Sequence, residues 1–255
     1  MSSVASAQGL FDRLGIGKKK SSDSAVASSA ALAGLSEAQV ATGLKEALAK
    51  GVESAVGRLG VADGFLKDAA VRIPMPENLR KVERTLRTLK QDALADQFVT
   101  TLNRAAEQAV PEAAAVLGDS LKQMTLQDAK VILVGTNNAA TAYFRRTSTT
   151  NLQERFLPIV KRATEQAGVT RVYKQMLDQA QGGALGGFGK LGAGLLGVDT
   201  VDLDSYVTSK SLDGLFLKIG DEERRIRESA AARTTDLLKQ VFGAVQQKVA
   251  GAGGR

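Results

Sequence analysis

Polar side chains with binding chemistry occur at three places in the chain, and the first is an Ala-rich helical stretch. Asn103 and Glu107 are four residues apart there, so a helix points both side chains the same way. An amide and a carboxylate on one face can bind a polar ligand or a metal ion. Buried pairs of this kind also hold neighbouring helix ends by hydrogen bonds. The pair therefore predicts either a ligand site or a structural contact.

The second place is the run 137–146, which holds the densest mixture of polar and aromatic side chains. Its candidate ligand-binding residues are Asn137, Asn138, Thr141, Tyr143 and Arg145. Amide, hydroxyl and phenol groups donate and accept hydrogen bonds, and an arginine fork binds a carboxylate or phosphate through two bonds. The alternative is a junction between helices that the same hydrogen bonds hold together.

The third place is a basic stripe of Arg80, Arg84 and Arg87, which recur every three or four residues. Such a stripe can contact an anionic surface of phospholipid headgroups, lipopolysaccharide or nucleic acid. Glu83 and Asp92 dilute its charge, and a solvated helix face is the alternative. No nucleic-acid partner is expected, because aromatic residues make up only 4% of the chain and no recognition motif is present.

Composition limits the chemistry further. The 255 residues include no Cys and no His, and Lys and Arg outnumber Asp and Glu by 34 to 27. These counts exclude thiol nucleophiles, iron–sulfur clusters, Ser-His-Asp catalysis and His-ligated zinc. Proton transfer would depend on carboxylates such as Glu107, Asp128, Asp213 and Glu222, whose spacing forms no diagnostic pair. The sequence therefore assigns no catalytic residue, no metal site and no cofactor.

Helices must position these side chains, since apolar residues recur every three or four positions and no strand pattern competes. Ser36 and Gln39 have the spacing of a capping box at the start of the first helix, and Gly60 is a plausible end for it. The segment 73–76 contains two prolines, which predicts an extended connection.

The middle of the chain is helical in pattern throughout. One long pattern runs from Glu77 to Pro111, where the proline either kinks the helix or starts a new one. Thr125, with an acid three residues later, marks a further helix start. Residues 147–151 predict a polar break after the run 137–146.

The region 182–197 holds eight of the 26 glycines and a single charge. Glycine at this density disfavours a helix, so a long loop is expected. Its apolar side chains suit insertion into a membrane surface or an apolar groove, or simple packing on the domain. Beyond it, Asp204 is expected to cap a helix, residues 221–223 predict a charged turn, and residues 237–249 predict a last helix.

The predicted fold class is all-α, a single compact multi-helix bundle over residues 35–250 that contains the long Gly-rich loop. A flexible, disordered leader covers residues 1–34, and a tail covers residues 251–255. Within the leader, residues 5–7 read Ala-Ser-Ala, the small-x-small form of a signal-peptidase site. We interpret the leader as a signal-peptide remnant, with coincidence in an Ala/Ser-rich stretch as the alternative. No stretch predicts a transmembrane segment.

Six stretches of the chain together resemble one bacterial family. They are LSEAQVATGLKEALAKGVESAVGRLG (35–60), GFLKDAAVRIPMPENLRKVERTLR (64–87), LNRAAEQAVPEA (102–113), AKVILVGTNNAATAYFRRTSTTNLQERFLPIVKRATEQAGVTRVYKQM (129–176), DLDSYVTSKSLDGLFLKIGDEERRIR (202–227) and ARTTDLLKQVFG (232–243). In this order they resemble the bacterial domain-of-unknown-function family 4197. The resemblance implies a helical protein that usually follows an export or lipoprotein signal, and it implies no activity. The Gly-rich loop departs from the family pattern.

These observations predict a non-enzymatic protein of the bacterial periplasm or cell envelope that acts by binding. The expected partner is a lipid or other partly apolar ligand, because the helices are Ala-rich, the Gly-rich loop is apolar and the net charge is +7. The net positive charge also suits peripheral contact with an anionic membrane surface. The alternative is a scaffolding module that binds another envelope protein, and a carboxylate-dependent enzyme is a third class. The sequence does not define an oligomeric state.

Overall fold

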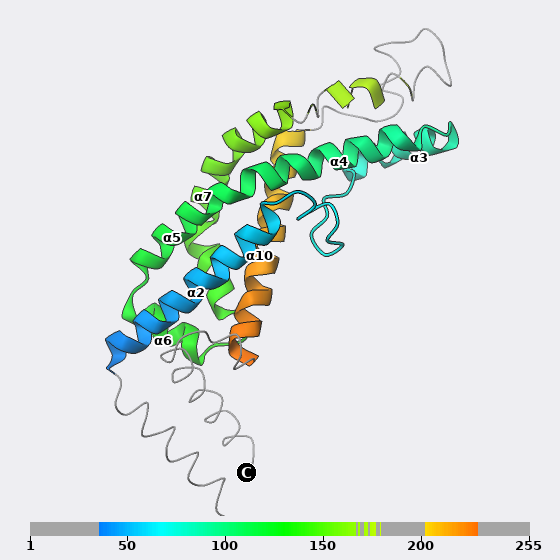
Figure 1. The fold of residues 1–255 in the computed structure, drawn as a ribbon. Coiled ribbons are helices and arrows are strands. Elements are labelled where there is room, and N and C mark those ends of the chain that lie inside the picture. The colour runs from blue at the N-terminus through cyan, green and yellow to red at the C-terminus, as the bar shows by residue number, and fades with distance from the viewer. Residues whose placement is uncertain are drawn as a thin grey trace, which may run out of the picture.

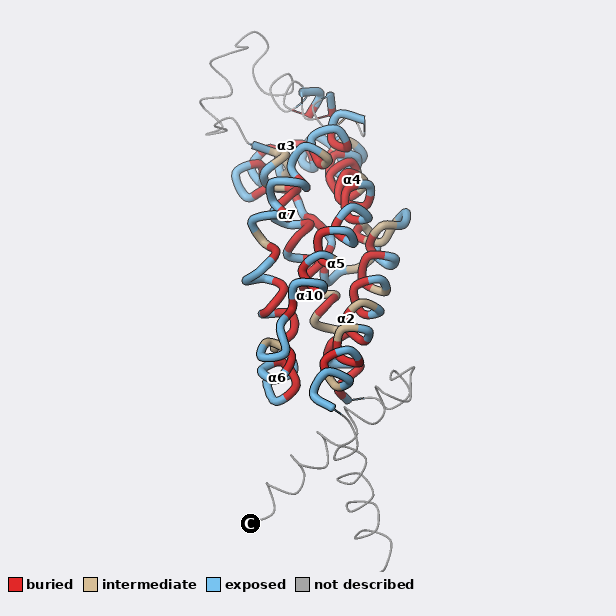
Figure 2. The backbone as a smooth tube through the Cα atoms, turned by 90° about the vertical axis from the view of Figure 1, so that its left-hand side faces the viewer, coloured by how far each residue is buried: buried red, intermediate tan, exposed pale blue. Residues whose placement is uncertain are grey.

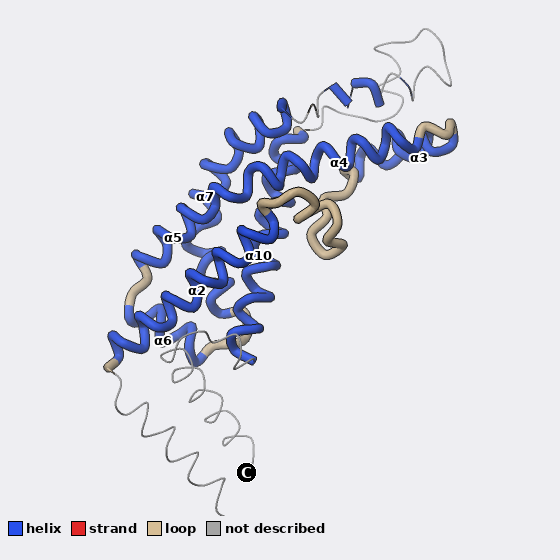
Figure 3. The backbone as a smooth tube through the Cα atoms, in the orientation of Figure 1, coloured by secondary structure: helices blue, strands red, loops and turns tan. Residues whose placement is uncertain are grey.

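A computed structural model gives the fold. It describes residues 36–166, 168, 171–172, 174–176, 179 and 202–228. All regular structure within these residues is helical (Figure 3), so the all-α prediction is confirmed. The predicted leader, the Gly-rich loop 182–197, the last helix 237–249 and the tail lie outside the described residues.

Helix α2 (Glu37–Leu59) begins and ends where local chemistry predicts. The Ser36 hydroxyl accepts a hydrogen bond from the Gln39 amide, and the Gln39 side chain accepts one from the Ser36 amide. This capping box satisfies two backbone donors that the first helical turn would otherwise leave open. Gly60 forms the C-cap, as predicted.

The prediction of one long helical pattern from Glu77 to Pro111 is wrong, because the chain reverses direction near residue 90. A 3₁₀ turn η1 (Glu77–Leu79) leads into α3 (Arg80–Thr88), and α4 (Asp92–Ala109) returns antiparallel to it. Lys90 has a φ of 57°. Its amide donates to the Arg87 carbonyl, and the Gln91 amide donates to the Leu86 carbonyl. These two bonds are a Schellman motif, in which a lysine occupies the position that glycine usually takes.

The two later helix starts in this half follow the sequence more closely. Pro111 lies in the 3₁₀ turn η2 (Val110–Glu112), which connects α4 to α5 (Ala113–Gln123). Helix α6 (Leu126–Val134) starts with a second capping box, formed by Thr125 and Asp128, and Gly135 forms its C-cap. The start of α6 is therefore as predicted.

Helix α7 (Ala139–Gln166) is continuous, so the predicted break over residues 147–151 is wrong. The hydroxyls of Thr147 and Thr149 donate hydrogen bonds within the helix, to the carbonyls of Tyr143 and Arg145 four residues earlier. Thr147 also shares a 2.7 Å hydrogen bond with Ser120 of α5. Tertiary contact with α5 thus compensates for the low helix propensity of this stretch.

Helix α10 (Leu203–Glu228) corrects two predictions, the cap at Asp204 and the charged turn over residues 221–223. Asp202, not Asp204, caps it, because its carboxylate accepts from the Ser205 amide and hydroxyl. Residues 221–223 continue the helix instead of forming a turn. Their glutamates are held by other helices, as described below.

The helices pack side by side into an elongated bundle (Figure 1). Helix α7 contacts α4, α5 and α10, and α10 also contacts α2. Buried backbone lies on the facing sides of the helices and exposed backbone outside (Figure 2). The largest fully buried side chains are five phenylalanines, Phe65, Phe98, Phe144, Phe156 and Phe216. The α3–α4 hairpin lies at one end of the bundle and α6 at the other (Figure 1).

Candidate functional site

A pocket of about 680 Å³ lies beside the α3–α4 hairpin. Its lining comes from the connection after α2, from α3 and from α4, and consists of Ala69, Arg72, Pro74, Met75, Arg80, Glu83, Arg87 and Val99. Small-molecule pockets run from about 300 to 1,000 Å³, so the volume suits a ligand of ordinary size. The lining combines three arginines and one glutamate with four apolar residues.

The wall of the pocket that carries residues 72–75 is fixed by two side chains from other helices. Asn103 of α4 accepts a hydrogen bond from the Ile73 amide at 2.8 Å and donates to the Ile73 carbonyl at 2.9 Å. The Tyr206 hydroxyl of α10 donates to the Pro74 carbonyl at 2.9 Å. Burial raises the pKa of Tyr206, while nearby Arg80 acts to lower it. The wall is therefore rigid although it is not helical.

Glu107 anchors the start of the same connection. Its Oε1 accepts from the amides of Phe65 and Leu66, and its Oε2 lies 2.6 Å from the Arg104 guanidinium. The Phe65 ring then packs on Gly214 of α10, where an added Cβ would lie 2.8 Å from the ring. These contacts hold the connection between α4 and α10.

The predicted pair Asn103 and Glu107 is thus buried and bound to the chain itself. Every side-chain oxygen and nitrogen of the two residues has a partner in the backbone or in Arg104. The contacts match the structural alternative, in which the pair holds a neighbouring segment. A ligand on these two residues stays a prediction to which the geometry adds no support.

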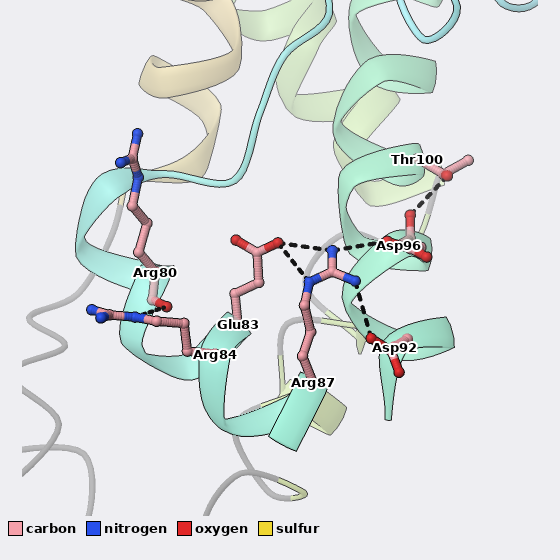
Figure 4. Close-up of polar contacts among 7 residues, drawn as sticks. All are labelled: Arg80, Glu83, Arg84, Arg87, Asp92, Asp96 and Thr100. Atoms are coloured by element: carbon pink, nitrogen blue, oxygen red, sulfur yellow. Dashed lines mark hydrogen bonds and ion pairs between the residues drawn. The ribbon is translucent and has the colours of Figure 1, made fainter. Parts of the chain in front are cut away.

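Arg87 is the centre of an ionic cluster that joins α3 to α4 (Figure 4). Its guanidinium contacts Glu83 at 2.8 Å, Asp96 at 3.1 Å and Asp92 at 3.2 Å. These carboxylates, Glu83 first, raise the pKa of Arg87 above its usual range. The cluster neutralises Glu83, the acidic residue of the pocket lining.

The other two arginines of the predicted basic stripe, Arg80 and Arg84, contact fewer carboxylates than Arg87 does. Arg80 pairs with Glu77 at 2.8 Å, but both side chains are more than half exposed. The Arg84 Nε donates to the Arg80 carbonyl at 3.4 Å, which leaves its terminal nitrogens directed away from the Arg87 cluster (Figure 4). An exposed ion pair is worth about 0–1 kcal/mol, so a ligand can displace Glu77 at little cost.

The predicted site over residues 137–146 is divided by the structure. Thr141 and Tyr143 are buried, and their hydroxyls donate to Glu223 and to the Ser120 carbonyl. Asn137 and Asn138 are exposed and bond to Glu228 and Thr136. Arg145 is also exposed, with its guanidinium 4.5 Å from the centre of the Phe216 ring. The five residues do not converge on one cavity, and the arrangement matches the predicted alternative, a helix junction.

The main contact of that junction is a glutamate from outside the run 137–146, which was not predicted to lie there. Glu223 of α10 accepts from the amides of Ala140 and Thr141 at the start of α7, both at 2.9 Å. Arg227 binds the same carboxylate and donates to the Ile132 carbonyl near the end of α6. A buried ion pair therefore supplies negative charge to a helix N-terminus and positive charge to a helix C-terminus, as helix dipoles favour.

Among the described residues, the remaining buried carboxylate is Glu222, which faces α2. It contacts Ser54 and Arg58 of that helix and Arg225 of its own. Each of the three buried glutamates thus binds at least one arginine, and none faces another across the pocket. Within the described residues, no group of acidic side chains has a geometry that could hold a metal ion.

The extended connection predicted over residues 73–76 is confirmed, but its place in a pocket beside Arg72 was not predicted, although a signal for it exists. From residue 71 to residue 75, Val71, Ile73 and Met75 are buried, whereas Arg72 and Pro74 are exposed. This alternation is typical of an extended segment with one face on the core. It could have predicted that Arg72 points away from the core beside the helical arginines.

Comparison with known proteins gives a family and nothing more specific. Among the described helices, none is long and apolar enough to cross a membrane. No curated protein and no solved structure matches the chain. The family model described as "Protein of unknown function (DUF4197)" matches residues 34–243, which is most of the sequence. The chain therefore belongs to the DUF4197 family, as its sequence motifs indicated.

Proposed function

We propose that this chain is a non-enzymatic protein of the bacterial periplasm or cell envelope that binds a partly apolar ligand such as a lipid. The observation that carries the proposal is the pocket beside α3, which joins apolar residues to arginines in a volume suited to a ligand. Its rigid wall favours binding, because a preformed site loses little conformational entropy when it is occupied.

Native mass spectrometry of the protein, purified gently from the periplasm, tests the proposal. We expect an adduct of discrete mass on the native chain. Ala69→Trp, at an exposed position of the pocket lining, should remove the adduct by filling the pocket. Ala114→Trp, at an exposed position of α5, is the matched control and should retain it. A bare chain, or an adduct that survives Ala69→Trp, would contradict binding in this pocket.

Export is a separate part of the proposal and has a separate test. The small-x-small triplet at residues 5–7 and the family resemblance support it. Fractionation of the native host should place the protein outside the cytoplasm. Recovery only from the cytoplasm would contradict export while leaving the pocket proposal open.

A scaffolding function is the second candidate, and a specific surface favours it. Helix α6 exposes Val131 (55%), Val134 (82%) and Leu126 (48%) on the end of the bundle opposite the pocket. A photo-crosslinking amino acid at position 134 should then capture one defined envelope protein in living cells. The same amino acid at exposed position 122 of α5 is the control. Equal capture at both positions would contradict a specific surface.

A further inference from the structure

We infer that the pocket beside α3 binds the phosphate group of an anionic amphiphile, with Arg72 and Arg80 as the phosphate-binding residues. The inference rests on the proposed function and names its ligand class. The pocket lining holds three arginines and one glutamate, so it carries a net charge of +2. Because Arg87 is committed to Glu83, Asp92 and Asp96, the charge available to a ligand lies on Arg72 and Arg80.

Both of these arginines are accessible. Arg72 is exposed and makes no ion pair with any residue that the structure describes. Among the residues that the structure describes, Arg80 makes one ion pair, the exposed contact with Glu77, which solvent screens. The backbone beside Arg72 is held in place, because Asn103 binds both the amide and the carbonyl of the neighbouring Ile73. Two arginines therefore line one pocket, Arg72 from the wall that Asn103 holds and Arg80 from the start of a helix.

The number of guanidinium groups favours phosphate over carboxylate. One arginine fork satisfies both oxygens of a carboxylate, whereas a phosphate monoester presents three oxygens and up to two negative charges. The apolar side of the pocket gives the remainder of the ligand a place to lie. Of the apolar lining residues, Ala69 and Pro74 are exposed, and Met75 and Val99 are buried. A phosphate joined to an acyl chain satisfies both sides at once.

Arg87 is a positioning residue in this arrangement. Its ion pair with Glu83 removes the one negative charge of the lining that would repel a phosphate. Loss of Arg87 should weaken phosphate binding, and removal of Glu83 as well should restore it. A purely structural role for Arg87 would not be rescued by the second change, because Asp92 and Asp96 would still lack their partner.

The test compares three small ligands by calorimetry on the full chain, below their aggregation concentrations. Lysophosphatidic acid carries both phosphate and acyl chain, monoacylglycerol carries only the chain, and glycerol 3-phosphate carries only the phosphate. We expect lysophosphatidic acid to bind about tenfold or more tightly than either of the others. Arg72→Gln with Arg80→Gln should weaken it by about tenfold, since each tenfold step is only about 1.4 kcal/mol. Arg155→Gln, an exposed arginine of α7, should leave the affinity unchanged.

The outcomes separate this inference from the proposed function. If monoacylglycerol binds as tightly as lysophosphatidic acid, the phosphate site is overturned and the apolar binding function stands. If glycerol 3-phosphate binds as tightly, the phosphate site stands and the apolar function is overturned. If none of the three binds to a chain shown to be folded by circular dichroism, both are overturned. Retained affinity in the Arg72→Gln, Arg80→Gln variant would also overturn the assignment of these residues.

Discussion

The Arg87 guanidinium lies 3.1 Å from the Asp96 carboxylate, although nine residues and a reversal of chain direction separate them. Lys90, in the left-handed region at a φ of 57°, makes that reversal. Because α4 returns alongside α3, one arginine meets acids from two helices. The ion cluster and the pocket beside it thus depend on a turn with no glycine or proline.

Arg87→Gln tests how far this cluster holds the hairpin. The change leaves Glu83, Asp92 and Asp96 close together without their shared cation, so they should repel one another. Because the cluster is partly exposed, we expect the free energy of unfolding to fall by only about 1 kcal/mol. Amide hydrogen exchange of residues 86–91 should accelerate more clearly. Arg155→Gln is the control, and unchanged exchange at residues 86–91 would show that the cluster does not hold the turn.

Asn103→Ala tests the anchor of the pocket wall. The change leaves the buried amide and carbonyl of Ile73 without their partners, and each unsatisfied buried group costs about 1–3 kcal/mol. We expect the free energy of unfolding in urea to fall by about 3 kcal/mol. Gln108→Ala, at an exposed position of the same helix, should have little effect. Equal losses in the two variants would contradict the anchoring role.

Glu223→Gln tests the junction of α6, α7 and α10. The variant keeps the shape of the side chain but removes the negative charge that faces the start of α7 and the Arg227 guanidinium. Breaking a buried ion pair from one side typically costs about 3–5 kcal/mol, and we expect a loss in that range. Glu154→Gln, on the exposed face of α7, is the matched control. A loss below about 1 kcal/mol would show that the pair contributes little to stability.

The Asp128 cap should make the start of α6 sensitive to acid. Hydrogen bonds from the Thr125 hydroxyl and amide hold the pKa of Asp128 below its usual value. As the pH falls below about 4, the unfolded chain therefore takes up a proton at this position before the folded chain does. The stability that Asp128 contributes is present above that pH and is lost as the pH falls through the folded-state pKa.

Asp128→Asn measures this contribution directly. The difference in free energy of unfolding between the native chain and the variant should be largest near neutral pH and shrink below about pH 4. Urea denaturation at a series of pH values gives the difference. A difference that stays constant from neutral to acid pH would contradict the role of the charged cap.

Some features of the fold could be predicted because their chemistry is local. The capping boxes at Ser36 and Thr125 each join residues three positions apart, so the sequence contains both partners. Apolar periodicity likewise predicted the helical class, since one helix face must be buried whatever it packs against. Gly60 and Gly135 end their helices for similarly local reasons.

Other features were decided only by the tertiary structure. The run 147–151 looks like a break in isolation, yet it is helical because α5 binds Thr147. Residues 221–223 look like a solvated turn, yet their glutamates are buried against α2 and α7.

The residues of the candidate site also divide into those that local sequence could predict and those that tertiary contacts decided. By itself, the sequence determined the all-α class, the family and the arginine spacing of the basic stripe. Within the stripe, Arg87 was bound by the acids of α4 only when α4 folded back on α3, whereas Arg80 stayed accessible. Arg72 joined them because Asn103 holds the neighbouring Ile73 across 30 residues of sequence. The contacts of Asn103 with Ile73 and of Arg87 with Asp96 join separate segments, so no local pattern contains both partners of either contact.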